Sequence, residues 1–199
     1  MNIYMKNRKI LLLVLLTIAL TLSGCFNFSG STTQKPTADT NSRIIDYPEF
    51  TITIPREWDV IESKNFTSEV PPETAIVVRN NVKNDTFTAN VNVVKRGLQG
   101  TMESLEYAKE VINRQKTGLY NYKENKQELT KIQIGDKSFD TYLERFEGKK
   151  DASSDLVDFI QIYGVKGNLG YIVTGAYSPQ ETGSNISTVE GIVKSFLLK

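Results

Sequence analysis

Histidine is absent from the 199-residue sequence, and cysteine occurs only once. Histidine is the usual general base near neutral pH and a common metal ligand. Its absence therefore excludes Ser-His-Asp hydrolysis, Cys-His proteolysis, HExxH zinc sites and c-type haem attachment. A single cysteine also cannot form a disulfide bond within the chain. The commonest hydrolytic and metal-dependent enzyme classes are thus excluded.

An excess of charge of either sign is also absent, because 24 basic residues are balanced by 23 acidic ones and the formal net charge is +1. No basic run is interleaved with aromatic residues, so we expect no nucleic acid partner. Hydrophobic residues make up 39% of the chain, which is enough for a folded core. We therefore expect one globular domain with attached segments.

The first 24 residues have the three parts of an export signal. A basic segment with Lys6, Arg8 and Lys9 precedes the apolar run Ile10–Leu20, and small residues follow. A helix that spans a bilayer needs about 20 apolar residues, so this run is too short to be a permanent anchor. Residues 1–24 are therefore predicted to be a signal peptide.

The tetrapeptide Leu22-Ser23-Gly24-Cys25 at the end of this signal resembles the lipobox of bacterial lipoproteins. The resemblance implies cleavage between Gly24 and Cys25, a diacylglycerol thioether on Cys25, and often a further acyl chain such as palmitate on the new amino terminus. Two or more acyl chains bind a membrane stably, whereas one does so only marginally. The alternative is an ordinary secreted protein in which the cysteine is incidental.

Lipidation of Cys25 predicts a protein held on the extracytoplasmic face of the cell membrane, or of the outer membrane if the host is diderm. Removal of residues 1–24 takes away three basic residues and leaves 21 basic and 23 acidic ones, a formal charge of −2. Net charge therefore does not attract the mature chain to anionic lipid, and membrane contact depends on the anchor.

A polar segment separates the predicted anchor from the predicted domain. The residues from Phe26 to about Asp46 are rich in Ser, Thr, Asn, Gly and Pro, a composition that buries too little apolar surface to fold alone. Residues 25–46 are therefore predicted to be the lipidated cysteine and a flexible tether, and residues 47–199 a globular domain.

Apolar periodicity predicts strands and two helices in this domain. A helix is expected after an N-cap at Thr101 and up to Gly118, and a second over Asn185–Leu197. Alternating residues predict strands over Phe50–Ile54, Trp58–Ile61, Ala75–Arg79, Thr86–Arg96, Glu128–Ile134, Ser138–Phe146, Leu156–Val165 and Leu169–Tyr177. Because the connections between strands are short, the predicted fold class is α+β, with a mainly antiparallel sheet flanked by helices.

Three segments of this domain resemble the PsbP-like family. They are the hairpin FTITIPREW (Phe50–Trp58), the helix pattern SLEYAKEVI (Ser104–Ile112) and the closing IVKSF (Ile192–Phe196). The resemblance covers about residues 44–199 and implies an α/β/α sandwich, shared by the photosystem II protein PsbP and by lipoproteins of the DcrB and LpqN type. Members share no common chemistry, so it implies no catalytic residue, cofactor or metal ligand.

Candidate chemical residues are few. The carboxylates of Asp151, Asp155 and Asp158 could bind Ca²⁺, but their spacing fits no calcium loop, so we expect a polar turn. Glu144 and Glu147 lie on opposite faces of one predicted strand and cannot act as a catalytic pair. Three aromatic side chains could line a pocket but are expected to be buried in the sheet: Trp58, Tyr142 and Tyr163.

The sequence therefore favours a non-catalytic binding or accessory module, held outside the cytoplasmic membrane and recognising a protein partner in the envelope. We expect no enzymatic activity, cofactor or metal site. The alternative is a carrier of a small ligand or lipid, or a hydrolase that uses carboxylates and a hydroxyl without histidine. Such a protein needs an enclosed pocket with convergent polar groups.

Overall fold

The computed structural model describes residues 40–66, 70–81 and 87–199. The chain divides into two units, Met1–Thr33 and Gln34–Lys199, and all described residues belong to the second. The predicted signal peptide, Gly24, Cys25 and most of the predicted tether lie outside the described residues. None of the helices in the described part is both long and apolar enough to cross a membrane.

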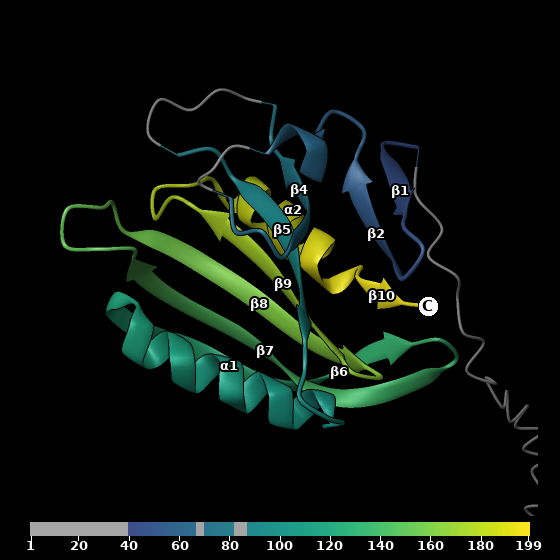
Figure 1. The fold of residues 1–199 in the computed structure, drawn as a ribbon. Helices are drawn as coiled ribbons and strands as arrows, with labels where there is room; N and C mark the ends of the chain where they lie inside the picture. Colours follow the sequence, from purple (N-terminus) through teal and green to yellow (C-terminus); the bar gives the residue numbers. More distant parts are fainter. Residues whose placement is uncertain (1–39, 67–69, 82–86) are drawn as a thin grey trace, which may run out of the picture. The chain divides into compact units, whose positions relative to one another are not determined.

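The described residues form ten strands, two α-helices and one short 3₁₀ helix (Figure 1). The strands are β1 (Ser42–Asp46), β2 (Phe50–Pro55), β3 (Asp59–Glu62), β4 (Thr74–Arg79), β5 (Asn90–Gly97), β6 (Tyr120–Ile134), β7 (Lys137–Lys149), β8 (Val157–Lys166), β9 (Leu169–Tyr177) and β10 (Leu197–Leu198). The helices are α1 (Ser104–Gly118), α2 (Gly183–Lys194) and the 3₁₀ helix η1 (Ser63–Asn65).

All ten described strands belong to one sheet with the order β1-β2-β10-β6-β7-β8-β9-β5-β4-β3. Among the described strand pairs, only β10 and β6 run parallel, and the others are antiparallel. The two-residue strand β10 joins β2 to β6 through Leu197 and Leu198. The hairpins therefore supply most of the sheet, and the carboxyl-terminal strand connects its two parts.

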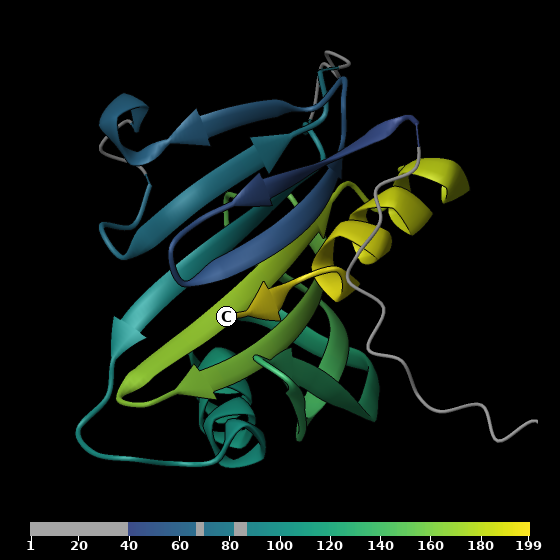
Figure 2. The same cartoon turned by 90° about the vertical axis from the view of Figure 1, so that its right-hand side faces the viewer.

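The prediction of a helix-flanked α/β/α sandwich is wrong. Strands make up 51% of the described residues, and the sheet curls into a half-barrel with only two α-helices in the described part (Figures 1 and 2). Strands twist with a fixed hand, so a sheet of about ten strands tends to curl rather than stay flat. Much of the inner core is consequently enclosed by the sheet itself.

The inner core lies on the concave side of this sheet. It combines side chains of strands from both ends of the sheet, such as Ile52 of β2 and Val93 of β5, with Val189 and Val193 of α2. Helix α2 approaches β9 closely, because a Cβ on Gly175 would lie 2.3 Å from Val189 Cγ1. Glycine at this position lets the helix close one side of the core.

A smaller core lies on the outer face of the sheet under α1. Tyr107, Ala108, Val111 and Ile112 of the helix pack there against residues of β8 and β9. Alternating side chains of β7, β8 and β9 thus face either the inner core or α1. The segment Ser138–Phe146 carries aromatic residues on both faces, from which the sequence analysis predicts that both faces of this strand are covered. The two cores explain this pattern.

Several predicted boundaries differ from the structure. Residues Ser42–Asp46, placed in the tether by their polar composition, form the edge strand β1, and partly buried Ile45 packs against the inner core. The closing helix, predicted over Asn185–Leu197, is observed as α2 and ends at Lys194, and Leu197 belongs instead to strand β10. The predicted N-cap Thr101 is also wrong, since Glu103 is the N-cap of α1. The two residues of β10 are extended because they pair with β2 and β6, which are distant in sequence.

Candidate functional site

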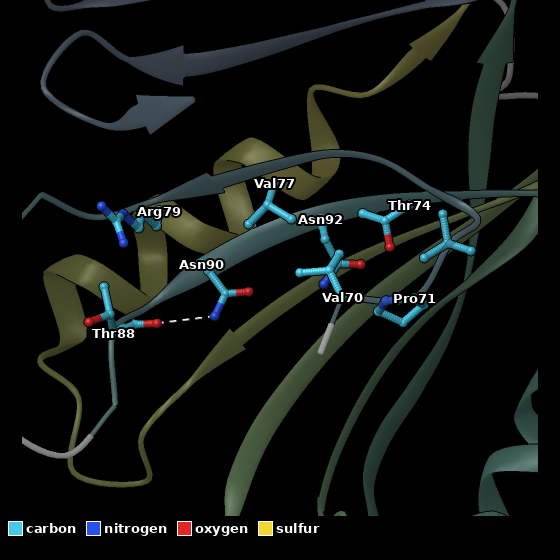
Figure 3. A pocket seen from close by; sticks show the side chains of 9 residues that line it. Val70, Pro71, Thr74, Val77, Arg79, Thr88, Asn90 and Asn92 are labelled. Atoms are coloured by element: carbon cyan, nitrogen blue, oxygen red, sulfur yellow. Dashed lines mark hydrogen bonds between the residues drawn. The ribbon is translucent and has the colours of Figure 1, made fainter. Parts of the chain in front are cut away.

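A groove of about 340 Å³ lies on the outer face of β4 and β5 and is open to solvent (Figure 3). Its apolar lining comes from Val70, Pro71, Val77 and Val94. Its polar lining comes from Thr74, Arg79, Thr88, Asn90 and Asn92. The groove therefore combines an apolar strip with amide, hydroxyl and guanidinium groups.

The groove is lined by polar residues because successive side chains of β5 point to opposite faces of the sheet. Val91 and Val93 point into the inner core, which places Asn90 and Asn92 on the outer face. Helix α1 packs on β6, β7 and β8 and contacts β9 at Ile172, and its core reaches β5 only at partly buried Val94. No described helix covers the outer face of β4, or the outer face of β5 from Asn90 to Asn92.

The side-chain amides of Asn90 and Asn92 form a two-step ladder along β5. Residues two apart on one strand are separated by about 7 Å. Asn90 Nδ2 donates to the backbone oxygen of Thr88 over 3.1 Å (Figure 3). The Asn92 amide makes no hydrogen bond to any residue that the structure describes. Both asparagines therefore retain hydrogen-bonding capacity toward the groove.

Arg79 supplies a positive charge to the groove. Its guanidinium lies 3.5 Å from Asp59 Oδ2 on the edge strand β3, and its side chain is 53% exposed. An ion pair of this length and exposure holds the guanidinium weakly. Arg79 can therefore exchange Asp59 for an acidic group of a ligand.

A row of polar side chains runs across the outer face from this groove toward α1. Asn92 pairs with Thr174 of β9, Thr174 pairs with Gln161 of β8, and Gln161 pairs with Glu144 of β7. Directly opposed residues of antiparallel strands lie on the same face, with Cβ atoms about 5 Å apart. The groove is thus connected to the interior under α1 by consecutive polar neighbours.

Glu144 is the unusual member of this row because its carboxyl group is completely buried, with 0% of the residue exposed. Tyr122 Oη lies 2.5 Å from Glu144 Oε1, and Tyr163 Oη lies 2.6 Å from Oε2. Burial raises the pKa of Glu144, although the two tyrosine hydrogen bonds oppose this effect. Burial also raises the pKa values of Tyr122 and Tyr163, which therefore stay neutral.

The backbone of β6 brings Tyr122 to this carboxyl group. Asn121 has a φ angle of +54°, in the left-handed region that asparagine tolerates better than most residues, and the β6–β7 register shifts between Tyr120 and Lys123. The Tyr122 ring stacks on Phe146 at 5.3 Å, and Phe146 stacks on Phe159 at 4.9 Å. This aromatic stack fixes the tyrosine hydroxyl beside Glu144.

Two glutamines continue the network. Gln115 Nε2 of α1 donates to Gln161 Oε1 over 2.7 Å, and Gln161 Nε2 donates to Thr174 Oγ1 over 2.9 Å. Tyr163 Oη also lies 2.8 Å from Gln161 Oε1. Gln115 Oε1 is buried without a hydrogen-bond partner among the described residues. The network therefore joins the end of α1 to the row.

The structure does not bring the acidic candidates together into a metal site. Asp151 accepts hydrogen bonds from Ser153 and Ser154, which lower its pKa to about 2 and give it the role of a turn residue. Asp158 lies in β8. Within residues 40–66, 70–81 and 87–199, no group of three His, Cys, Asp or Glu side chains is placed to hold a metal ion.

Of the aromatic candidates, Trp58 and Tyr163 are buried and Tyr142 is partly buried, and none lines the groove. Glu147 pairs with Lys123 at 3.0 Å, away from Glu144. Sequence reasoning missed the groove and the burial of Glu144. Its one available signal was the polar series Thr88, Asn90 and Asn92 on the solvent face of a predicted strand.

Comparisons with known proteins support the fold. No family model matches the sequence, and no curated protein matches it. The solution structure of cyanobacterial PsbP from Synechocystis is similar with a TM-score of 0.54 and 9% identity, over 85% of this chain and 99% of that one. The crystal structure of LpqN, involved in cell envelope biogenesis of Mycobacterium tuberculosis, has a TM-score of 0.49 and 10% identity, over 79% and 90% of the two chains.

The similarity to cyanobacterial PsbP shows that the folded unit has a PsbP-like fold. The resemblance of the segments Phe50–Trp58, Ser104–Ile112 and Ile192–Phe196 to the PsbP-like family is thereby confirmed, although the sandwich architecture inferred from it is not. At 9% identity the similarity concerns the fold alone.

Proposed function

We propose that this PsbP-like unit is a non-catalytic binding module, anchored through lipidated Cys25 on the extracytoplasmic face of a membrane. The proposed ligand is an extended polypeptide segment of an envelope protein, bound in the groove on β4 and β5. The observation that carries the proposal is the ladder of Asn90 and Asn92 beside an open apolar strip.

The spacing of the ladder matches an extended peptide. Such a chain repeats its backbone orientation every two residues, or about 7 Å, which is also the separation of residues two apart on β5. Each asparagine amide offers donors and an acceptor, so each can bond both the N–H and the C=O of one residue of an extended chain. Two residues of a ligand, spaced two apart, can therefore be held in register with β5.

The remaining lining supports a peptide with apolar and acidic side chains. Val77 and Val94 lie on the same face as the asparagines and offer apolar contact to side chains of the ligand. Arg79 at the groove, whose ion pair with Asp59 is long, offers a charge-assisted hydrogen bond to a carboxylate. The preferred segment is therefore an extended one with a small apolar residue and an acidic residue.

The groove favours binding over the alternative functions. A lipid or small-ligand carrier encloses most of its ligand, whereas this groove is open along one side. Its polar lining consists of amides, hydroxyls and one guanidinium, none of which is a general base at neutral pH. A hydrolase would need such a base near the ligand.

Photo-cross-linking in cells tests the proposal. A photoreactive amino acid at position 92 of the full chain should capture one envelope protein, and the attachment point should map to an extended segment of it. The same amino acid at Asn113, exposed on α1, serves as the matched control. Capture of lipid alone, or of the same proteins from positions 92 and 113, would overturn the proposal.

A further inference from the structure

The hydrogen atoms available around Tyr163 do not suffice for an ionised Glu144. Tyr163 Oη has one hydrogen but lies within hydrogen-bonding distance of two oxygens, Glu144 Oε2 at 2.6 Å and Gln161 Oε1 at 2.8 Å. Gln161 Oε1 carries no hydrogen and already accepts from Gln115 Nε2. If Tyr163 donates to a carboxylate, two bare oxygens face each other at its other contact.

We propose that Glu144 is a proton-binding site that is occupied in the folded protein at neutral pH, and that its proton sets the direction of the hydrogen bonds running from α1 to the groove. This inference goes beyond the proposed function and does not depend on it.

A protonated Glu144 completes the network as it stands. The carboxylic acid donates from Oε2 to Tyr163 Oη, and Tyr163 donates onward to Gln161 Oε1. Tyr122 donates to Glu144 Oε1. Each of these hydroxyl groups then donates once, and each facing oxygen accepts. Within the described network, the one polar atom left without a partner is Gln115 Oε1.

Loss of the Glu144 proton reverses the direction of the hydrogen bonds along the network. Tyr163 must then donate to the carboxylate, so Gln161 has to present its Nε2 to Tyr163 instead of its Oε1. Amide oxygen and nitrogen occupy nearly equivalent positions, so rotation of both the Gln161 and Gln115 amides by half a turn satisfies this contact without moving the backbone. Thr174 then donates to Gln161 Oε1, where it previously accepted from Nε2.

The reversed network is the more costly one. Rotation of Gln115 replaces its buried, unpartnered oxygen by a buried amino group with two unpartnered hydrogens. It also leaves a full negative charge under α1, where Glu144 has no exposed surface. Both effects favour the protonated state in the folded protein.

The charged groups around Glu144 do not reverse this preference. Tyr122 and Glu124 face it from β6, Tyr163 from β8 and Lys116 from α1. Lys116 favours the ionised form, but it pairs with Glu124 at 2.8 Å, and Glu124 opposes it. Arg145, the next residue of β7, binds Glu128 and Glu190 instead. Burial is the largest influence, and it raises the pKa of Glu144.

The consequence reaches the groove through Thr174. With Glu144 protonated, Thr174 Oγ1 accepts from Gln161, so its own hydrogen is available to a neighbour. With Glu144 ionised, that hydrogen is used on Gln161. Asn92 lies directly opposite Thr174, and its side-chain amide has no hydrogen bond to another described residue. The proton on Glu144 therefore decides whether Thr174 offers Asn92 a donor or only an acceptor.

Infrared spectroscopy of the mature protein with ¹³C-labelled glutamate tests the proton site. At pH 7 we expect one carbonyl band of a protonated carboxylic acid, which is lost in Glu144→Gln. Glutamine has the shape of the neutral acid, so this variant should fold. Glu147→Gln, on the same strand but ion-paired at the surface, should keep the band. Absence of the band in the native protein at pH 7 would overturn the proposal.

Side-chain amide resonances test the coupling. The Gln115 and Gln161 NH₂ signals of the native protein should shift together as pH is raised through the titration of the infrared band. They should stay constant in Glu144→Gln. Tyr163→Phe removes the shared hydroxyl and should abolish the shift of the Gln161 signal while leaving a buried carboxyl group. Amide signals that do not respond while the band titrates would refute the reversal.

Discussion

The ring of Tyr107 on α1 occupies the space that a side chain at Gly170 of β9 would need. A Cβ added to Gly170 would lie 2.4 Å from Tyr107 Cζ. Tyr107 is 1% exposed and belongs to the core under α1. The absence of a side chain at Gly170 therefore determines how closely α1 packs on the outer face of the sheet.

Gly170→Ala should consequently destabilise the protein by about 1–3 kcal/mol, as expected for overpacking of a well-packed site. Urea unfolding of the mature protein measures this change. Gly97→Ala is the matched control, because Gly97 lies on the neighbouring strand and an added Cβ there would have no atom within 4 Å. Equal effects of the two substitutions would contradict the close packing of Tyr107 on Gly170.

Burial of Glu144 predicts a loss of stability at high pH. Because the folded-state pKa of Glu144 lies above its ordinary value of 4.5, the folded protein binds a proton that the unfolded chain has released. This contribution is fully present below the unfolded pKa and is lost as pH rises through the folded one. Glu144→Gln cannot titrate, so its unfolding free energy relative to the native protein should increase with pH. A constant difference across the series would count against the raised pKa.

For Glu128 we expect the opposite pH dependence, with stability lost in acid. Hydrogen bonds from Lys126 and Arg145 lower its pKa from 4.5 to about 2. The stability that these bonds provide is present above the unfolded pKa and is lost as pH falls toward the folded one. Glu128→Gln should therefore lose stability at neutral pH but show a shallower acid transition. Glu106→Gln, on exposed surface of α1, is the control, and a matching acid transition in both variants would contradict this prediction.

Substitution of the groove asparagines should weaken binding of the partner segment without destabilising the fold. Replacing Asn90 and Asn92 by alanine removes two amides that each contribute about 0.5–1.5 kcal/mol as hydrogen-bonding groups, so partner affinity should fall roughly tenfold or more. The unfolding free energy should change little, because both side chains face the open groove. Titration of the captured partner segment measures the affinity. The control variant Asn113→Ala should bind the segment with native affinity. Unchanged affinity of the double variant would show that Asn90 and Asn92 do not contribute to binding.

Cys25→Ser tests the anchor. The sulfur of Cys25 is the predicted nucleophile for diacylglycerol transfer, and a serine hydroxyl is a far weaker one. The variant should accumulate as an unlipidated precursor that retains residues 1–24. Mass spectrometry of the amino terminus in native and variant protein measures this directly. A native protein cleaved at another bond, with an unmodified Cys25, would disprove the lipid anchor.

The sequence predicts elements best where local signals agree. Alternation and the turn at Gly167, which has a φ angle of +62°, predict β9 with its observed bounds of Leu169–Tyr177. Gly118, predicted to stop the helix, is likewise the last residue of α1. Strand β10 has only two residues, and its extended conformation depends on pairing with β2 and β6. Such long-range pairing leaves no local pattern, and the curl of the sheet likewise depends on contacts between distant strands.

In the candidate site too, features with a local sequence signal are predictable and features that depend on distant contacts are not. Alternation along β5 predicts that Asn90 and Asn92 are solvent-facing, but the groove exists only because α1 lies over other strands. The burial of Glu144 has no local signal, since carboxylates are rarely buried unless hydrogen-bonded partners compensate them. Those partners, Tyr122 and Tyr163, come from two other strands.

The late position of β10 also bears on the order in which the chain can assemble. The hairpin of β1 and β2 leaves the ribosome early and pairs Thr51 with Asp46, but Thr51 acquires its partner on the other side of β2 only when Leu197 has been made. Until then one edge of β2 is open and the inner core lacks Leu198, which is completely buried in the finished protein. Long-range closure of this kind slows folding. A newly synthesised chain therefore cannot join the two parts of its sheet until Leu197 and Leu198 have been made.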